Sequence, residues 1–222
     1  MYIPRHFRMS PDEALSALAH VRLADLITVD PETLSPVLTP VPFLYDPTVG
    51  PLGSFQGHVA RPNTQWSHTA HPALVVIRGE DAYVTPAWYP SYRAGKESVP
   101  TWNYEVVQAT GRLVTHTEPD WLEAHVRALA ARHDPGYDLD GVERGSLDGM
   151  LRAIVGVEIV ISAIEGKSKL SQNRSTTDIE GVADGLDEIG RDVLAARIRD
   201  VSTPYAANRE QAVEAARQRA GE

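Results

Sequence analysis

The stretch "IVGVEIVISAIEGKSKLSQNRS", residues 154–175, changes character halfway along. Its first half is apolar on both faces, which predicts a strand in the centre of a sheet. Its second half gathers cations, hydroxyls and amides, and it holds two of the chain's three lysines, Lys167 and Lys169. This cluster is therefore either a candidate anion site or an ordinary solvated strand end. We expect the strand to end with a bend between the two lysines, which would send one lysine into the site and leave the other at its rim.

The segments on either side of this stretch predict an α+β chain. Strands are expected at 23–29, 35–46, 53–61 and 101–117, and a Gly-Glu turn at 79–80 is expected to join a hairpin. Helices are expected at 10–21, 118–133 and 146–154, and from residue 176 to the end with a break at Gly190 and a last cap at Asn208. Because the helices do not alternate with the strands, we expect an antiparallel barrel that carries helices.

Composition narrows the classes of function. The formal net charge of −9 disfavours nucleic acid and anionic lipid as partners unless a basic patch overcomes it. The chain has no cysteine, which excludes disulfides, thiolate nucleophiles and iron–sulfur clusters, and this suits a cytoplasmic protein. No secretory signal is visible at the N-terminus and no apolar run approaches the roughly 18 residues of a membrane span.

Nucleotide and metal motifs are weak. The letters "GKS" at 166–168 would need a glycine at position 161 to form a P-loop, but that residue is Ile161. His68 and His71 lack a third ligand, so no metal site is expected. No residue pattern identifies a catalytic side chain. The segment "GHVARPN", 57–63, could donate to a phosphate through His58 and Arg61, or it could be an ordinary exposed strand end.

The aromatic residues beside prolines, in "AWYPSYR" and "VPTWNYE", allow two interpretations. They could wall a flat heterocycle, or they could belong to the core or to a dimer interface. Within the second segment Asn103 is notable because a side-chain amide can pair with the edge of a ring system.

Several stretches, taken in order, resemble the PaiB-type FMN-binding negative transcriptional regulators. They are "MYIPRHF", "GHVARPNTQW", "AYVTPAWYPS", "VPTWNYEVVQATGRL" and the opening stretch. The resemblance implies a split β-barrel of the pyridoxamine-phosphate-oxidase-like type, a homodimer with FMN in clefts between its subunits, and a role in repressing protease and sporulation genes. It also divides the chain into an FMN-binding domain, 1–175, and a helical extension, 176–222, packed on the same domain or on the dimer.

Carried onto this sequence, the resemblance assigns ten cofactor-binding residues. It places His58, Arg61 and Asn63 near the FMN phosphate, Trp102 and Asn103 near the isoalloxazine ring, and Lys167, Lys169, Ser171, Gln172 and Asn173 at the flavin cleft or its rim. FMN needs cations at one end, amides along the ring edge and apolar walls, so the residues themselves agree with this ligand. The anion predicted for the opening stretch is then the flavin phosphate.

Two further functions stay open. The chain could be an FMN-dependent oxidoreductase acting on a small molecule, or a split-barrel interaction module without flavin. For the regulatory interpretation, the arginines of the C-terminal region are interleaved with acidic residues, which argues against direct DNA binding.

Overall fold

The computed structural model describes residues 1–220. The strands are β1 Leu23–Val29, β2 Pro36–Pro42, β3 Leu44–Asp46, β4 Ser54–Ala60, β5 Ala73–Val84, β6 Thr101–His116 and β7 Ile154–Lys169. The α-helices are α1 Pro11–Ala19, α2 Pro90–Arg93, α3 Pro119–His133, α4 Arg144–Arg152, α5 Thr176–Glu188 and α6 Asp192–Ala220, and short 3-10 turns lie at Arg5–Phe7, Thr64–Ser67, Pro86–Trp88 and Leu139–Gly141.

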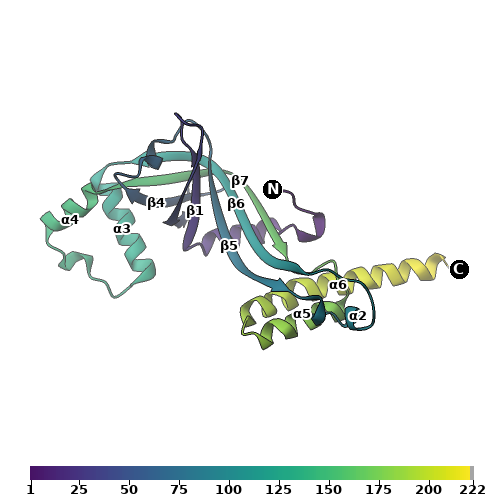
Figure 1. The fold of residues 1–222 in the computed structure, drawn as a ribbon. Coiled ribbons are helices and arrows are strands. Elements are labelled where there is room, and N and C mark those ends of the chain that lie inside the picture. The colour runs from purple at the N-terminus through teal and green to yellow at the C-terminus, as the bar shows by residue number, and fades with distance from the viewer. Residues whose placement is uncertain (221–222) are drawn as a thin grey trace. The chain divides into compact units, whose positions relative to one another are not determined.

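The seven strands form one sheet in the order β2-β1-β5-β6-β7-β4-β3 (Figure 1). β1 runs antiparallel to β2 and β5, and β4 runs antiparallel to β3 and β7. The expected α+β class with an antiparallel split barrel is confirmed. β7 lies inside the sheet, as its two apolar faces predict. The proline-bearing β2 lies at an edge, where the missing N–H groups of its prolines cost no ladder bond.

The barrel closes through side chains rather than through a further ladder. β2 and β4 are far apart in the sheet order, yet a Cβ on Gly57 of β4 would lie 2.7 Å from Cγ1 of Val41 of β2. After β4, the buried Gln65 donates through Nε2 to the carbonyl of Leu26 in β1 at 3.0 Å and to that of Val37 in β2 at 3.1 Å. Gly57 therefore allows β4 to approach β2 closely, and the two hydrogen bonds of Gln65 hold the segment after β4 against β1 and β2.

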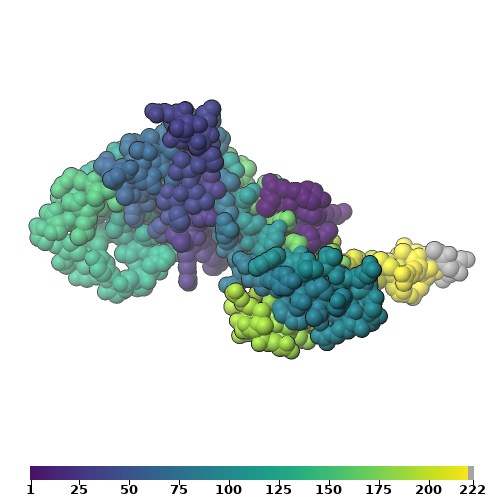
Figure 2. All heavy atoms as spheres, viewed as in Figure 1, coloured from purple at the N-terminus to yellow at the C-terminus, as the bar shows by residue number. Residues whose placement is uncertain are grey.

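The chain divides into two compact units. Unit 1 comprises Met1–Ser10, Arg78–Val106 and Gly166–Glu222, and unit 2 comprises Pro11–Ile77 and Val107–Glu165. In unit 1, α5 and α6 lie side by side and bury a core that includes Tyr89, Leu170 and Leu186 (Figure 1). The C-terminal part of α6 extends beyond α5 in the space-filling view (Figure 2). In unit 2, α3 and α4 share a cluster of Leu122, Leu147 and Leu151.

The hairpin expected at 79–80 is wrong, because β5 runs without interruption from Ala73 to Val84. The glycine there does not serve a turn. A Cβ on Gly79 would lie 3.0 Å from Cβ of Glu105 on β6, so glycine allows this pair of residues to approach closely.

The cap expected at Asn208 is also wrong, since α6 is one helix that even includes Pro204. Tertiary contacts hold this region as a helix. Ser202 Oγ donates to the carbonyl of Leu170 at 2.7 Å, and Arg209 donates to the carbonyls of Gln172, at 2.7 Å, and Arg174. The break at Gly190 is confirmed: this residue has φ +73° and separates α5 from α6. No helix within residues 1–220 combines the length and the apolar character that crossing a membrane requires.

Candidate functional site

A cavity of about 240 Å³ lies in unit 1 where the opening stretch ends. It is bounded by the N-terminal 3-10 turn, the loop and strand start at 99–103, the end of β7 and the turn before α5. Its lining residues are Phe7, Tyr89, Val99, Pro100, Thr101, Asn103, Lys169, Ser171, Asn173 and Arg174. Four of the ten predicted residues, Asn103, Lys169, Ser171 and Asn173, therefore meet at one cavity.

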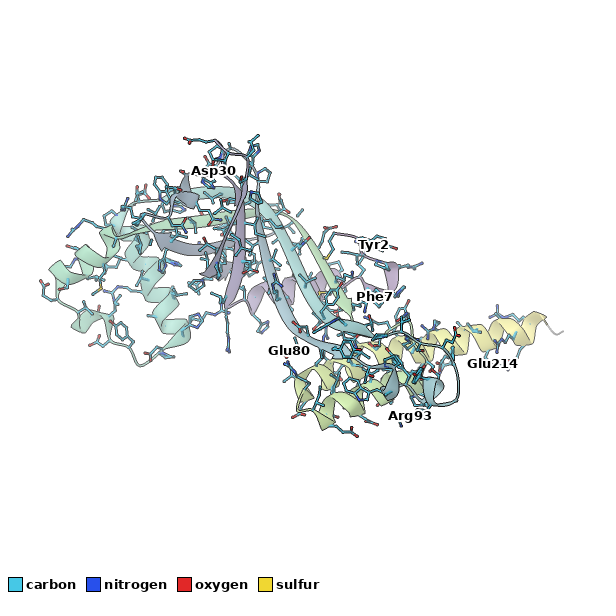
Figure 3. The ribbon with its side chains drawn as sticks, in the orientation of Figure 1. Tyr2, Phe7, Asp30, Glu80, Arg93 and Glu214 are labelled. Atoms are coloured by element: carbon cyan, nitrogen blue, oxygen red, sulfur yellow. The ribbon has the colours of Figure 1, made fainter. Side chains whose placement is uncertain are left out.

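The two lysines lie on the same strand, because β7 continues through Lys169. The predicted bend between them is wrong. Their roles nevertheless differ. Nζ of Lys169 donates to Oγ1 of Thr101 at 2.6 Å and to the carbonyl of Trp102, which keeps it at the cavity wall. Nζ of Lys167 lies over the ring of Tyr104, 5.3 Å from its centroid, and donates to the carbonyl of Tyr2 at 3.4 Å. Tyr2 lies on the N-terminal segment (Figure 3).

The chain turns only after Leu170, and buried amides hold the turn. Ser171 has φ +70°, a strained value for a residue with a side chain. Its Oγ lies 3.0 Å from Nδ2 and 3.2 Å from Oδ1 of the fully buried Asn103. Gln172 accepts from the N–H of Leu170 at 2.8 Å and donates to the carbonyl of Ser168 at 2.6 Å. The amide of Gln172 is thus used to shape the turn.

Trp102, which was predicted to lie near the isoalloxazine ring, is at the surface. The side chain of Trp102 is 53% exposed and meets Tyr83 edge to face, with ring centroids 6.0 Å apart. Its backbone carbonyl, rather than its indole, contacts the cavity through Lys169.

Six of the ten lining residues were absent from the predicted set, and two of them, Tyr89 and Arg174, bear most on the chemistry of the cavity. Tyr89 is fully buried, and its hydroxyl makes no hydrogen bond to any described residue. The guanidinium of Arg174 lies 4.4 Å from the centroid of the Tyr89 ring, and burial raises the pKa of the Tyr89 hydroxyl. The only sequence signal was that Arg174 sits within the polar cluster and Tyr89 within an aromatic segment.

The cavity is cationic and lacks a compensating acid. No aspartate or glutamate is among its lining residues. Burial, then the charges of Lys167 and Arg174, hold the pKa of Lys169 below its ordinary value. A half-buried cation beside other cations is stabilised by an anion or by an electron-rich ring edge. With Phe7 and Tyr89 as walls and Asn103 as the amide, the residues fit one end of a flavin.

His58, Arg61 and Asn63 lie in unit 2, and all three have partners there. Nδ1 of His58 is 3.1 Å from Nε2 of His125. Arg61 donates to the carbonyls of Arg152 and Ile154, at 2.6 and 2.9 Å. Asn63 accepts from the N–H of Gln65 at 3.0 Å, capping a 3-10 turn, and donates to Oγ1 of Thr39 at 3.1 Å.

Metal ligation finds no support in the part of the chain that is described. No group of three or more histidine, aspartate or glutamate side chains among residues 1–220 could hold an ion. His68 is buried and its Nδ1 lies 2.9 Å from Oγ1 of Thr28.

Comparisons with known proteins identify the family of the chain. Residues 1–163 match the family described as "Putative FMN-binding domain". The chain is 29% identical over 193 residues to "Protease synthase and sporulation protein PAI 2" of Bacillus subtilis, covering 84% of this chain and 89% of that protein.

Among solved structures, the flavocytochrome Anf3 of Azotobacter vinelandii has a similar fold, with a TM-score of 0.55 and 14% identity over 75% of this chain and 72% of that one. The FAD and heme binding protein of Mycobacterium smegmatis is similar too, with a TM-score of 0.52 and 19% identity over 72% of this chain and 71% of that one. From the family match, which covers most of the chain, we conclude that this protein belongs to the PaiB-type family of FMN-binding proteins.

Proposed function

We propose that this protein holds one end of FMN in the cavity of unit 1 and acts as a negative transcriptional regulator of the PaiB type. The observation that carries the cofactor site is the meeting of Lys169, Arg174 and Asn103 at a cavity without carboxylates, next to the buried and unpartnered hydroxyl of Tyr89. A buried hydroxyl without a partner is unfavourable, and a bound ligand would satisfy it.

Each side chain would have a distinct task. Lys169 and Arg174 would supply positive charge, and Asn103 would orient the ligand through its amide, which the Ser171 hydroxyl holds in place. Phe7 and Tyr89 would wall the ring and exclude water. FMN, when bound, supplies the capacity to accept and donate electrons.

We propose that the functional form is a homodimer. Ligand pockets of drug-sized molecules usually measure about 300–1,000 Å³, and the cavity of about 240 Å³ falls short of that range. A second chain would complete the pocket around the rest of FMN. Light scattering at micromolar concentration should give the mass of two chains, whereas a monomer that binds FMN tightly would contradict this part of the proposal.

The regulatory role is supported by the relative whose name refers to protease synthesis and sporulation. We propose that any effect on transcription is indirect and occurs in the cytoplasm, which suits a chain without cysteines. Several arginines of α6 are already engaged: Arg199 pairs with Glu180, Asp184 and Asp187, and Arg197 pairs with Glu105. Mobility shifts with promoter DNA should show no complex at physiological salt.

Titration of the purified protein with FMN, followed by flavin fluorescence, tests the cofactor site. Tyr89→Phe should weaken FMN several-fold, because a neutral hydrogen bond contributes about 0.5–1.5 kcal/mol. Tyr92→Phe is the matched control, since Tyr92 belongs to the same segment but is 45% exposed. Failure of the wild-type protein to bind FMN, or equal affinities of the two variants, would refute the proposed site.

A further inference from the structure

We propose that the cavity of unit 1 receives the pyrimidine edge of the isoalloxazine ring rather than the FMN phosphate, and that Lys169 and Arg174 there make the protein bind reduced FMN more tightly than oxidised FMN. This inference rests on the proposed function. It goes further by assigning the orientation of the cofactor and a preference for one redox state.

The lining of the cavity suits a ring edge better than a phosphate. Phe7, Tyr89, Val99 and Pro100 give it aromatic and apolar walls, which a phosphate dianion does not need. Asn103 presents an amide, whose donor and acceptor match the alternating N–H and C=O groups of a pyrimidine edge.

The helix that begins beside the cavity is closed to phosphate. Backbone N–H groups at a helix N-terminus commonly bind phosphate. At the start of α5, however, the N–H of Thr176 donates to Oε1 of Glu210 at 3.0 Å and its hydroxyl donates to Oε2 at 2.9 Å. The N–H of Asp178 donates to Oγ of Ser175 at 3.2 Å. A phosphate approaching this terminus would meet the carboxylate of Glu210, and the N–H groups of Thr176 and Asp178 already have partners.

The positive charge of the cavity would favour the reduced state of the bound flavin over the oxidised state. The oxidised ring is neutral. Two electrons from a donor such as a reduced nicotinamide or dithionite, with one proton taken up at N5, leave one negative charge along the N1–C2 edge. Lys169 and Arg174 would stabilise that charge, and no carboxylate lines the cavity to oppose them. Lys169 is partly buried and held by Thr101, so salt screens it less than a surface lysine.

Affinity and potential are linked, because a site that binds the reduced form more tightly raises the midpoint potential of the bound flavin by the corresponding amount. The experiment measures FMN and riboflavin affinity, in the oxidised and dithionite-reduced states, and the midpoint potential of bound FMN. Lys169→Met should weaken reduced FMN about tenfold more than oxidised FMN, which lowers the midpoint potential by about 30 mV for a two-electron couple. Riboflavin should lose as much affinity as FMN in each state.

Two control variants and one replacement variant distinguish an effect of the Lys169 charge from a general loss of structure. Lys96→Met removes the third lysine, which is exposed, and should change nothing. Lys169→Arg keeps the charge and should keep the potential near that of the wild type. If circular dichroism shows that Lys169→Met is unfolded, Arg174→Gln takes its place with the same expected direction.

Two results would overturn the inference. If Lys169→Met weakens FMN but not riboflavin and leaves the potential unchanged, the lysine serves the phosphate and the assigned orientation is wrong, while the proposed FMN site stands. If the wild-type protein binds neither FMN nor riboflavin, the proposed function itself fails and the inference falls with it.

Discussion

Acid should destabilise this protein in part through the buried His125, and His125→Gln should remove that part of the sensitivity. His125 of α3 is 3% exposed, and its Nδ1 makes no hydrogen bond to any described residue. Its ring stacks on Trp121, with centroids 5.3 Å apart. Burial, then the neighbouring His58 and His116, lower the pKa of His125 from 6.5 to about 4.

The direction of the effect follows from proton linkage. The folded protein binds the proton of His125 less readily than the unfolded chain does, so the stabilising contribution of the neutral ring is complete above about pH 6.5 and is lost as the pH falls towards 4. One pH unit corresponds to about 1.4 kcal/mol, which sets a limit of about 3 kcal/mol. Between pH 7 and pH 5 the expected loss from this residue is about 2 kcal/mol.

The other groups that face this site are His58, His116 and Glu158. Burial lowers the pKa of His58 as well, so it adds to the acid sensitivity with the same sign. Nε2 of His116 lies 3.0 Å from Oε2 of Glu158, and the His116 ring stacks on Trp121 at 4.1 Å. These three groups are present in wild type and variant alike, so the difference between the two isolates His125.

The assay is urea unfolding of the wild type and His125→Gln at pH 7 and pH 5. Glutamine can present an amide towards His58 but does not titrate, so the variant should lose about 2 kcal/mol less than the wild type between the two pH values. His133→Gln is the matched control, because His133 is exposed at the end of the same helix. An equally steep loss of stability in wild type and His125→Gln would refute this reasoning.

Three further substitutions test the packing. Gly181→Ala should lower the free energy of unfolding by about 1–3 kcal/mol, since a Cβ there overlaps the carbonyl of Trp88. Gly149→Ala, in an open helical position, should raise it by about 0.5–1 kcal/mol. Thermal melts that rank the two variants the other way would contradict the described contacts. Arg61→Ala should lower the urea midpoint through the loss of two bonds to backbone carbonyls, worth about 1–3 kcal/mol; weaker FMN binding at unchanged stability would instead give this arginine a role in the cofactor site. Asn103→Ala should lose about 1–3 kcal/mol and also weaken FMN, and a variant with wild-type melting and FMN titration curves would remove it from the site.

Local patterns in the sequence determined much of the fold. The apolar run of β7 predicted an internal strand, the prolines of β2 predicted an edge, and Gly190 marked the end of α5. Such features depend on the chemistry of neighbouring residues, namely which faces are apolar, which N–H groups are missing and which positions need φ > 0. The polar cluster at 165–175 is of the same kind, because its composition made it a candidate anion site.

Only the tertiary structure decided how distant segments use these residues. Gly79 looked like a turn residue, but its lack of a side chain serves the approach of Glu105 from another strand. Asn208 looked like a helix cap, but contacts between α6 and the turn after β7 keep the helix continuous. Tyr89 joined the cavity because folding buries its hydroxyl beside Arg174, 85 positions further along the chain. Burial and contacts between remote segments are not encoded in local periodicity, so the sequence indicated a candidate site while the fold determined which side chains line its cavity.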